Sequence, residues 1–244
     1  MSGKIYHADL AWIHHVGFGG FAAGAAPGII ALLDEAGIED GLVVDLGSGS
    51  GILARHLTEA GYRVLGIDAS TAMTTLARRV APRATFRTAS LHDTRFPACR
   101  AVMAVGESIG YLAANRLAAG AYRRLFARVA TALEPGGLFL FDLVIRVGHR
   151  PVEYRDCQRG PDWAVLVDVM EDPARGILQR DITAFRKHGA TYRRSDERHW
   201  ARIDRRDDVT AELRHAGFTV RTLNAWGSQP LAPRRLAFVA RKRA

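Results

Sequence analysis

The sequence predicts an α/β fold centred on a mostly parallel, doubly wound sheet, and three observations support this. Short apolar segments alternate with amphipathic ones over residues 42–143, which is typical of parallel strands joined by crossover helices. The first apolar segment leads directly into a glycine-rich turn at 47–51. After Arg146 the pattern changes to long β-rich segments joined by short turns. We therefore expect four parts: an N-terminal helical cap (1–40), an α/β core (41–145), an antiparallel β insertion (146–205) and the C-terminal end of the core (206–244).

Length and composition agree with a folded enzyme-sized domain. The chain has 244 residues, of which 48% are hydrophobic and 24% charged. A chain of this size buries a sufficient core without disulfides. Its composition argues against a disordered, collagen-like or coiled-coil protein.

The cap and the core follow from local signals. Residues 5–20 mix aromatic, histidine and glycine residues and predict a short helix followed by a loop. Pro27 fits the first turn of a helix that ends near Gly37. Ser70 or Thr71 is expected to cap the helix after the second strand. The core strands are expected at 42–46, 63–67, 84–88, 101–105 and 138–143, and the core helices at 52–60, 71–80 and 115–133.

The insertion and the end of the chain contain the remaining strands. Hairpin signals at 172–176 and 188–189 separate three long segments. Asp207 or Asp208 is expected to cap a helix that ends near Gly217. The insertion strands are expected at 163–171, 177–187 and 191–203, and two further strands at 218–223 and 236–240 complete a sheet of seven.

The glycine-rich turn is the first motif with a chemical meaning. It reads VVDLGSGSG, with Asp45 two residues before Gly47. Glycines let the backbone pass close to a ligand and leave amides free at the next helix. A carboxylate at this place repels a pyrophosphate but tolerates an aminoacyl cation. Asp68, at the end of the second strand, is placed to accept both hydroxyls of a ribose.

Together these residues resemble the class I S-adenosylmethionine (SAM)-dependent methyltransferases. The resemblance covers roughly residues 40–145 through VVDLGSGSG, VLGIDAS, AVMAVGESIGYL and LEPGGLFLFDLV, and resumes at AELRHAGFTV. It implies a Rossmann-like, seven-stranded, mostly parallel sheet, with SAM as cofactor and S-adenosylhomocysteine (SAH) as product. A Rossmann-type oxidoreductase is the alternative for these residues.

The resemblance also implies roles for individual residues. The turn residues would hold the methionine part of SAM, Asp45 its ammonium group, and Asp68 with Ala69 the ribose. Met73 and the pair Ser90-Leu91 match apolar and polar positions near adenine, although the family's usual acid is displaced to Asp93. Tyr6 is expected to close over the cofactor. The full set of expected cofactor residues is Tyr6, Asp45, Gly47, Ser48, Gly49, Gly51, Asp68, Ala69, Met73, Ser90, Leu91 and Gly106.

The segment after the fourth strand bears on the acceptor. Enzymes that methylate base amino groups in nucleic acid commonly carry an Asn/Asp-Pro-Pro-aromatic motif here, whereas this chain reads GESIGY. With the cap and insertion, this segment resembles small-molecule N- and O-methyltransferases. We therefore expect methyl transfer to an N or O atom of a small-molecule acceptor. An RNA-directed methyltransferase that uses the basic C-terminal half, and a non-catalytic SAM-binding protein, are the alternatives.

Four residues are candidates for catalysis. Glu107 and Tyr111 follow the fourth strand, at the edge where ligands bind in open α/β sheets. Glu107 would attract a cationic amine or act as a base, and Tyr111 would orient the acceptor. His14 and His15, if helical, point about 100° apart, so one of them faces the acceptor and no metal site is expected. His199 can act as a base only if its strand face points inward.

Charge and cysteines complete the expectations. Residues 1–145 carry a net charge of +1 and residues 146–244 of +8, within a total of +9. Such an excess signals either an anionic partner or a genome that prefers arginine, since only Lys4, Lys187 and Lys242 are lysine.

Cys99 and Cys157 form no disulfide framework or zinc motif, which favours a cytoplasmic enzyme. The uncharged stretch 16–33 is too rich in glycine and alanine for a membrane span. A homodimer is compatible with the sequence.

Overall fold

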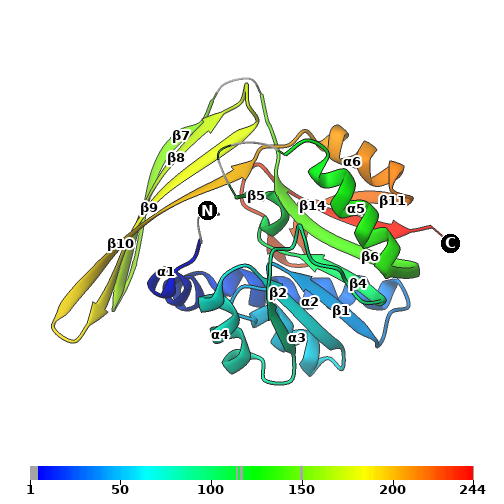
Figure 1. The fold of residues 1–244 in the computed structure, drawn as a ribbon, viewed down its shortest axis with the longest axis horizontal. Helices are drawn as coiled ribbons and strands as arrows, with labels where there is room; N and C mark the ends of the chain where they lie inside the picture. The colour runs from blue at the N-terminus through cyan, green and yellow to red at the C-terminus, as the bar shows by residue number, and fades with distance from the viewer. Residues whose placement is uncertain (1–4, 114, 116–117, 149–150, 244) are drawn as a thin grey trace.

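The centre of the molecule is a seven-stranded sheet in the order β11-β14-β6-β4-β1-β2-β3 (Figure 1). The computed structural model describes residues 5–113, 115, 118–148 and 151–243. All neighbouring strands are parallel except β14, which is antiparallel to β6 and to β11. The predicted fold class is therefore confirmed. The strands are β1 (Leu42–Leu46), β2 (Arg63–Asp68), β3 (Thr85–Thr88), β4 (Cys99–Ala104), β6 (Leu133–Val144), β11 (Phe218–Leu223) and β14 (Arg235–Lys242).

Helices cover both faces of this sheet. Because successive strand side chains point to opposite faces, Val43 packs with α2 and α3 while Val44 packs with α5 and α6. Each face thus buries its own apolar cluster, and the two clusters share the sheet as a common wall. The helices are α2 (Gly20–Glu35), α3 (Ile52–Glu59) and α4 (Thr71–Val80) on one face, and α5 (Ala121–Ala132) and α6 (Arg206–His215) on the other.

The insertion forms a second, antiparallel sheet in the order β5-β10-β9-β8-β7. Figure 1 shows it as a long ribbon that projects away from the core and passes beside α1. Its base packs on the core through a small apolar cluster that includes Val144, Leu178 and Ile203. Its strands are β5 (Tyr111–Leu112), β7 (Glu153–Gly160), β8 (Trp163–Asp172), β9 (Ile177–His188) and β10 (Thr191–Arg202).

The N-terminal cap connects the two sheets. Helix α1 (Ala8–Ile13) continues through a π-helical turn, η1 (His14–Phe18), into α2. Leu10 and Ile13 pack against Trp163 of the insertion. A Cβ added to Gly17 would lie 2.4 Å from a ring carbon of Trp163, so this contact requires glycine. Within the described residues no single helix passes a length and hydropathy test for a membrane span; 8–18 and 20–35 pass only jointly, across a 60° bend.

Five local expectations were wrong. The loop expected before residue 20 is π-helical, and Pro27 lies inside α2 instead of in its first turn. Burial of Ala25, Ala26 and Ile29 against the sheet stabilises the longer helix despite the missing proline N–H. Strand β6 begins at Leu133, so the Pro-Gly-Gly sequence lies within it, beside a register shift in β4.

The other two differences concern helix starts. Helix α5 begins at Ala121 after Gly120, which has φ +64°, and part of the expected helical segment (116 and 117) lies outside the described residues. Arg205 is the N-cap of α6, whereas Asp207 and Asp208 lie in the first turn, where carboxylates interact favourably with the helix dipole. Two small pieces were not predicted: the 3-10 turn η2 (Ser108–Gly110) and a hairpin of β12 (Ala225–Trp226) with β13 (Gln229–Pro230).

Candidate active site

The glycine-rich turn lies at the carboxyl end of β1, in the middle of the sheet. Gly47, Gly49 and Gly51 have φ values of +70°, +52° and +80°, which L side chains rarely adopt. A Cβ on Gly47 would lie 2.3 Å from the Cβ of Ser108, so the turn is fixed against the segment after β4. A Cβ on Gly49 would meet nothing within 4 Å. Glycine at this position therefore leaves open space, as a bound ligand requires.

Asp45 lies beneath this turn with its side chain buried. Its Oδ2 is buried without a hydrogen-bond partner among the described residues. Burial, and then the charge of Asp68, raises the pKa of Asp45 to about 7. A buried carboxylate without a partner is costly, and a cationic group at this place would relieve that cost.

Asp68 ends β2, next to the turn. Its Oδ2 accepts a hydrogen bond from Gly49 N–H at 2.9 Å, and its Oδ1 accepts one from Ser70 N–H at 2.8 Å. Burial raises the pKa of Asp68, although these two backbone donors oppose the shift. The structure thus brings Asp45, Asp68 and the glycines together, as the sequence predicted for a SAM site.

Ser70 links the end of β2, where the ribose of SAM is predicted to bind, to the N-terminal cap. Its Oγ caps α4 by accepting from Met73 N–H at 3.2 Å, as expected, and donates to the carbonyl oxygen of Tyr6 at 2.7 Å. Met73 is buried, whereas Ala69 is exposed beside Asp68. Ser48 is buried under the turn. Residues 68–70 therefore connect the predicted ribose site to Tyr6.

Ser90 and Leu91 follow β3 on the same edge. The Oγ of Ser90 accepts from His92 N–H at 3.2 Å, and Leu91 packs against the core. Arg128 of α5 donates to the carbonyl oxygen of Leu91 at 2.8 Å. This segment is held from the α5 side, and the role of Ser90 and Leu91 toward adenine stays a prediction.

Glu107 has a different environment from the one expected of a base. It is 2% exposed and has a φ of +64° in the segment after β4. Its carboxylate pairs with Arg180 of β9 at 2.7 Å and with Arg235 of β14. Two guanidinium groups, from β9 and β14, thus enclose this carboxylate, which joins the insertion to the core. The role of Glu107 toward the acceptor stays a prediction.

Gly106, just before it, is held by Asp142. The buried carboxylate of Asp142 accepts from the backbone N–H groups of Gly106 at 2.8 Å and of Glu107 at 3.0 Å. Burial raises the pKa of Asp142 to about 6. The positive φ of Gly106, +83°, completes a sharp turn above β4. The carboxylates of Asp142 and Glu107 therefore hold the backbone of this turn in place at the carboxyl end of β4.

Tyr6, Tyr111, His14 and His199 form an aromatic cluster above this edge. The hydroxyls of Tyr6 and Tyr111 are 2.9 Å apart. The Tyr6 ring centroid lies 5.1 Å from that of His14 and 4.9 Å from that of His199. Burial lowers the pKa of His14 to about 4, so its imidazole is neutral at pH 7. Tyr6 and Tyr111, predicted separately, are in contact.

His14 and His15 point to different sites, as their spacing predicted. His14 lies in the aromatic cluster, whereas Nδ1 of His15 lies 2.9 Å from the Oγ of Ser50 in the glycine-rich turn. His15 therefore faces the glycine-rich turn and His14 the aromatic cluster. Within the described residues no group of three or more His, Cys, Asp or Glu side chains is arranged to hold a metal ion.

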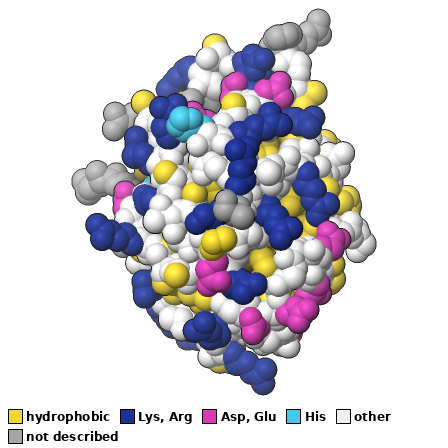
Figure 2. Space-filling model, turned by 90° about the vertical axis from the view of Figure 1, so that its right-hand side faces the viewer, with side chains coloured by type: hydrophobic (Ala, Val, Ile, Leu, Met, Phe, Trp, Pro, Cys, Tyr) yellow, Lys and Arg dark blue, Asp and Glu magenta, His cyan; other side chains and the backbone are white. Residues whose placement is uncertain are grey.

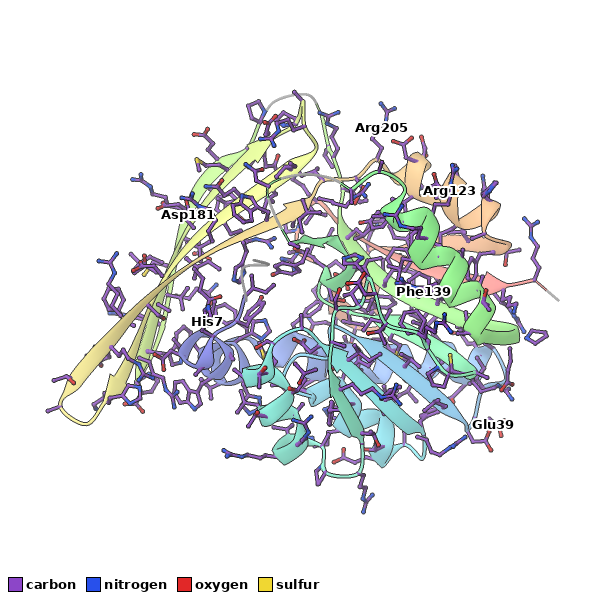
Figure 3. The ribbon with its side chains drawn as sticks, viewed as in Figure 1. His7, Glu39, Arg123, Phe139, Asp181 and Arg205 are labelled. Atoms are coloured by element: carbon purple, nitrogen blue, oxygen red, sulfur yellow. The ribbon has the colours of Figure 1, made fainter. Side chains whose placement is uncertain are left out.

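Residues 5–9, here called the N-terminal strap, are fastened to the insertion by two carboxylates. Glu197 of β10 accepts from Tyr6 N–H at 2.6 Å and from His7 N–H at 2.8 Å. Asp9 is 5% exposed and pairs with Arg193, with Arg186 at 3.3 Å and with His188 at 3.5 Å. Figure 3 shows His7 beside α1, where the insertion passes the cap.

Several of these residues were missed from the sequence. Arg180, Arg235 and Asp9 carried no local signal, because their partners lie far away in the chain. Glu197 and His199 carried one: they alternate with Arg194, Asp196 and Arg198 on β10, and the less basic face of that strand points inward. The inward orientation required for His199 to act as a base is thus present.

The comparisons with known proteins agree with this geometry. A family model described as "Methyltransferase domain" matches residues 43–137. Over these residues the chain is similar to a methyltransferase domain. The predicted resemblance is thereby confirmed for the part of the chain that contains the glycine-rich turn, Asp68 and Tyr111.

The methyltransferase domain has relatives among curated and solved proteins. The chain is 29% identical over 140 residues to a dTDP-3-amino-3,4,6-trideoxy-alpha-D-glucopyranose N,N-dimethyltransferase of Streptomyces venezuelae, a match that spans 57% of each protein. The crystal structure of Streptomyces venezuelae DesVI has a TM-score of 0.80 and 22% identity, covering 99% of this chain and 100% of that one. The sugar N-methyltransferase KedS8 of Streptoalloteichus has a TM-score of 0.76 and 19% identity, covering 100% and 98%.

Proposed function

We propose that this protein transfers a methyl group from SAM to an N or O atom of a small-molecule acceptor, and that an amine is the preferred acceptor. The observation that supports this best is that two groups of residues lie on facing sides of the carboxyl end of the core sheet. We call them the cofactor half and the acceptor half. Asp45, Asp68 and the open glycine turn form one, and the cluster of Tyr6, Tyr111 and His14 forms the other. A donor and an acceptor held on facing sides of an edge meet the geometric need of group transfer.

The residues at the cofactor half fit SAM. The unpartnered Oδ2 of Asp45 suits an ammonium group, and Asp68 stands where hydroxyls of a ribose are accepted. Gly49 leaves space above the backbone. When bound, SAM supplies a methyl group that is already electrophilic, so the protein needs only to hold and deprotonate the acceptor.

The acceptor half is polar and closed by the cap. The facing hydroxyls of Tyr6 and Tyr111 offer a hydrogen-bond donor and an acceptor, and the neutral imidazole of His14 lies beside them. The strap and the insertion cover this space and exclude water from the reacting atoms. A cavity without polar groups would have favoured the non-catalytic alternative, whereas this cluster favours an enzyme.

An amino group on a sugar is the acceptor that the relatives favour. The curated relative is an N,N-dimethyltransferase of an amino sugar, and KedS8 is a sugar N-methyltransferase. We carry only the amine over to this chain as the proposed target. The cytoplasmic location and the homodimer stay predictions.

The distribution of arginine argues against the RNA-directed alternative. Twelve arginines of the insertion and tail are paired with carboxylates, which neutralises much of the basic excess. On the side that carries α5 and α6, Figure 2 shows basic side chains interspersed with acidic, apolar and other ones. Nucleic-acid binding relies on basic groups free to contact phosphates, and a small-molecule acceptor requires no such surface.

Two measurements test the proposal. Calorimetry should show SAM and SAH binding to the wild-type protein, with Asp40→Ala, an exposed acid before β1, as a control that binds equally well. Labelled SAM is then incubated with a panel of amino sugars, including dTDP-3-amino-3,4,6-trideoxy-α-D-glucopyranose, and with a bacterial metabolite extract. Transfer of label to a small amine supports the proposal. Failure of the wild type to bind SAH, or transfer of label only to RNA, would contradict it.

A further inference from the structure

His199 is a buried imidazole with one nitrogen unused. It lies on β10, is 1% exposed, and its Nε2 is 2.8 Å from Oε2 of Glu197. Its Nδ1 is buried and has no hydrogen-bond partner among the described residues. A buried polar atom left without a partner lowers the stability of the folded protein. This cost indicates that a ligand completes the site.

Glu197 determines which nitrogen of His199 carries the proton. Its Oε1 accepts from His7 N–H, and its Oε2 accepts from Tyr6 N–H. Burial alone would raise the pKa of Glu197, but the bonds from His199 and from the backbone of His7 and Tyr6 lower it overall. An ionised carboxylate only accepts hydrogen bonds. Nε2 of His199 is therefore the donor in this contact, and Nδ1 is the ring nitrogen left for a ligand.

The groups around His199 form the proposed acceptor half. Tyr6 of the strap lies 4.9 Å away and Tyr111 of β5 lies 5.8 Å away, measured between ring centroids. Arg180 is the direct cross-strand partner of His199 on β9, and its charge is balanced by Glu107. His14 of η1 contacts the other side of the Tyr6 ring and is neutral at pH 7.

We propose that His199 is the proton acceptor of the reaction and that Glu197 is the residue that positions it. This assignment rests on the proposed function. The N–H bond of the acceptor ammonium breaks, its electron pair stays on the acceptor nitrogen, and the proton forms a new N–H bond at Nδ1 of His199. The freed lone pair is the nucleophile, and the imidazolium returns its proton to solvent after turnover. The arrangement follows the general pattern in which a carboxylate fixes the tautomer of a histidine base.

Nuclear magnetic resonance of the full chain with bound SAH tests the tautomer without any acceptor. Protein labelled with ¹⁵N-histidine should show His199 protonated at Nε2 and unprotonated at Nδ1 near pH 7. In Glu197→Gln the amide can donate to Nε2, and we expect the proton to move to Nδ1. A wild-type His199 that carries its proton on Nδ1 would overturn the assignment.

Kinetics with the amine identified by the labelled-SAM assay test the role. His199→Asn should lower kcat about 100-fold at pH 7, the usual effect of losing a general base. The loss should shrink as the pH rises and the free amine deprotonates in solution, while the affinity for SAH stays within threefold. His215→Asn, which changes a histidine at the end of α6, is the matched control and should equal wild type.

The results distinguish a failure of the proposed function from a failure of the His199 assignment. A wild-type protein that methylates no amine would defeat the proposed function. A His199→Asn variant with wild-type kcat and an unchanged pH profile would defeat this assignment alone. The strap is monitored by hydrogen exchange of the Tyr6 amide, because His199→Asn leaves Glu197 to hold it. An exchange rate equal to wild type with lowered kcat supports a chemical role over a structural one.

Discussion

The interactions that stabilise the core differ from those that attach the insertion to the cap and core. Each face of the core sheet buries a continuous apolar cluster, with side chains such as Phe139 and Leu140 pointing to opposite sides. The insertion meets the cap and core through two small apolar clusters and three buried carboxylates. Glu107 and Asp9 pair with arginines, and Glu197 accepts hydrogen bonds from the backbone of the cap. Apolar packing tolerates changes of sequence, whereas a buried ion pair requires both partners. The apolar core should therefore tolerate substitutions better than the contacts that attach the insertion.

The largest effect should follow from removing Arg180. Arg180→Ala leaves the buried Glu107 with Arg235 alone, and breaking a buried pair typically costs about 3–5 kcal/mol. Arg198→Ala, which breaks an exposed pair with Asp181 on the same sheet, is the matched control and should leave the stability unchanged within error. Thermal and urea unfolding measure both. Equal losses in the two variants would mean that the buried pair does not join the insertion to the core.

Asp68→Ala should have the next largest effect, on the cofactor half alone. It removes a predicted ribose acceptor and the anchor of Gly49 and Ser70 N–H, so SAH affinity should fall about 100-fold, or ~2.7 kcal/mol. Asp40→Ala should bind as wild type. Calorimetry measures the affinity, and hydrogen exchange checks that the insertion keeps its protection. An affinity within threefold of wild type would place the ribose elsewhere.

Asp9→Asn should release the strap without affecting the core. The neutral side chain keeps its size but loses ion pairs with Arg193, Arg186 and His188, and the loss of charged hydrogen bonds of this kind costs about 1.5–3 kcal/mol. Amide exchange in residues 6–13 should accelerate, and the KM of the acceptor should rise more than that of SAM. Asp156→Asn, an exposed acid on β7, is the control. Unchanged exchange in the cap would show that apolar contacts alone hold it.

The smallest effect is a pH dependence of cofactor binding that arises from Asp45. Its pKa of about 7 in the free protein should fall when an ammonium group binds beside it, because the opposite charge stabilises the ionised form. Binding then favours the ionised form, so SAH affinity should fall by up to about tenfold per pH unit below pH 7. It should be flat from pH 7 to 8, and Asp45→Asn should remove the dependence. Calorimetry between pH 5 and 8 decides it; a flat wild-type profile would place the ammonium away from Asp45.

The difference between local patterns and long-range contacts explains which features the sequence could predict. Strand and helix alternation, the glycine-rich turn and Asp68 are encoded within short stretches, so the sheet and the cofactor edge could be predicted. The contacts of Glu107 join residues 107, 180 and 235, and no local pattern encodes such a meeting. Strand β7 was missed because both of its faces are exposed, so its side chains have no reason to alternate.

Tyr6 shows what the sequence could predict and what it could not. Its position near the cofactor edge was expected from the resemblance, and its hydroxyl contact with Tyr111 follows from that placement. Its φ of +55° and its backbone bond to Glu197 were not foreseen. They depend on how β10 passes the cap, which is decided by tertiary packing.

The bond between Ser70 Oγ and the carbonyl oxygen of Tyr6 has a kinetic consequence. Ser70 also touches Asp68, so the strap lies across the rim through which the nucleoside part of SAM must enter. We expect arrival in a fixed sequence, with the donor first, then strap closure, then the acceptor, and with SAH departing last. Since the same Glu197 carboxylate holds the strap and orients His199, closure of the strap also fixes that carboxylate beside the imidazole. Closure and readiness for turnover would then be one event.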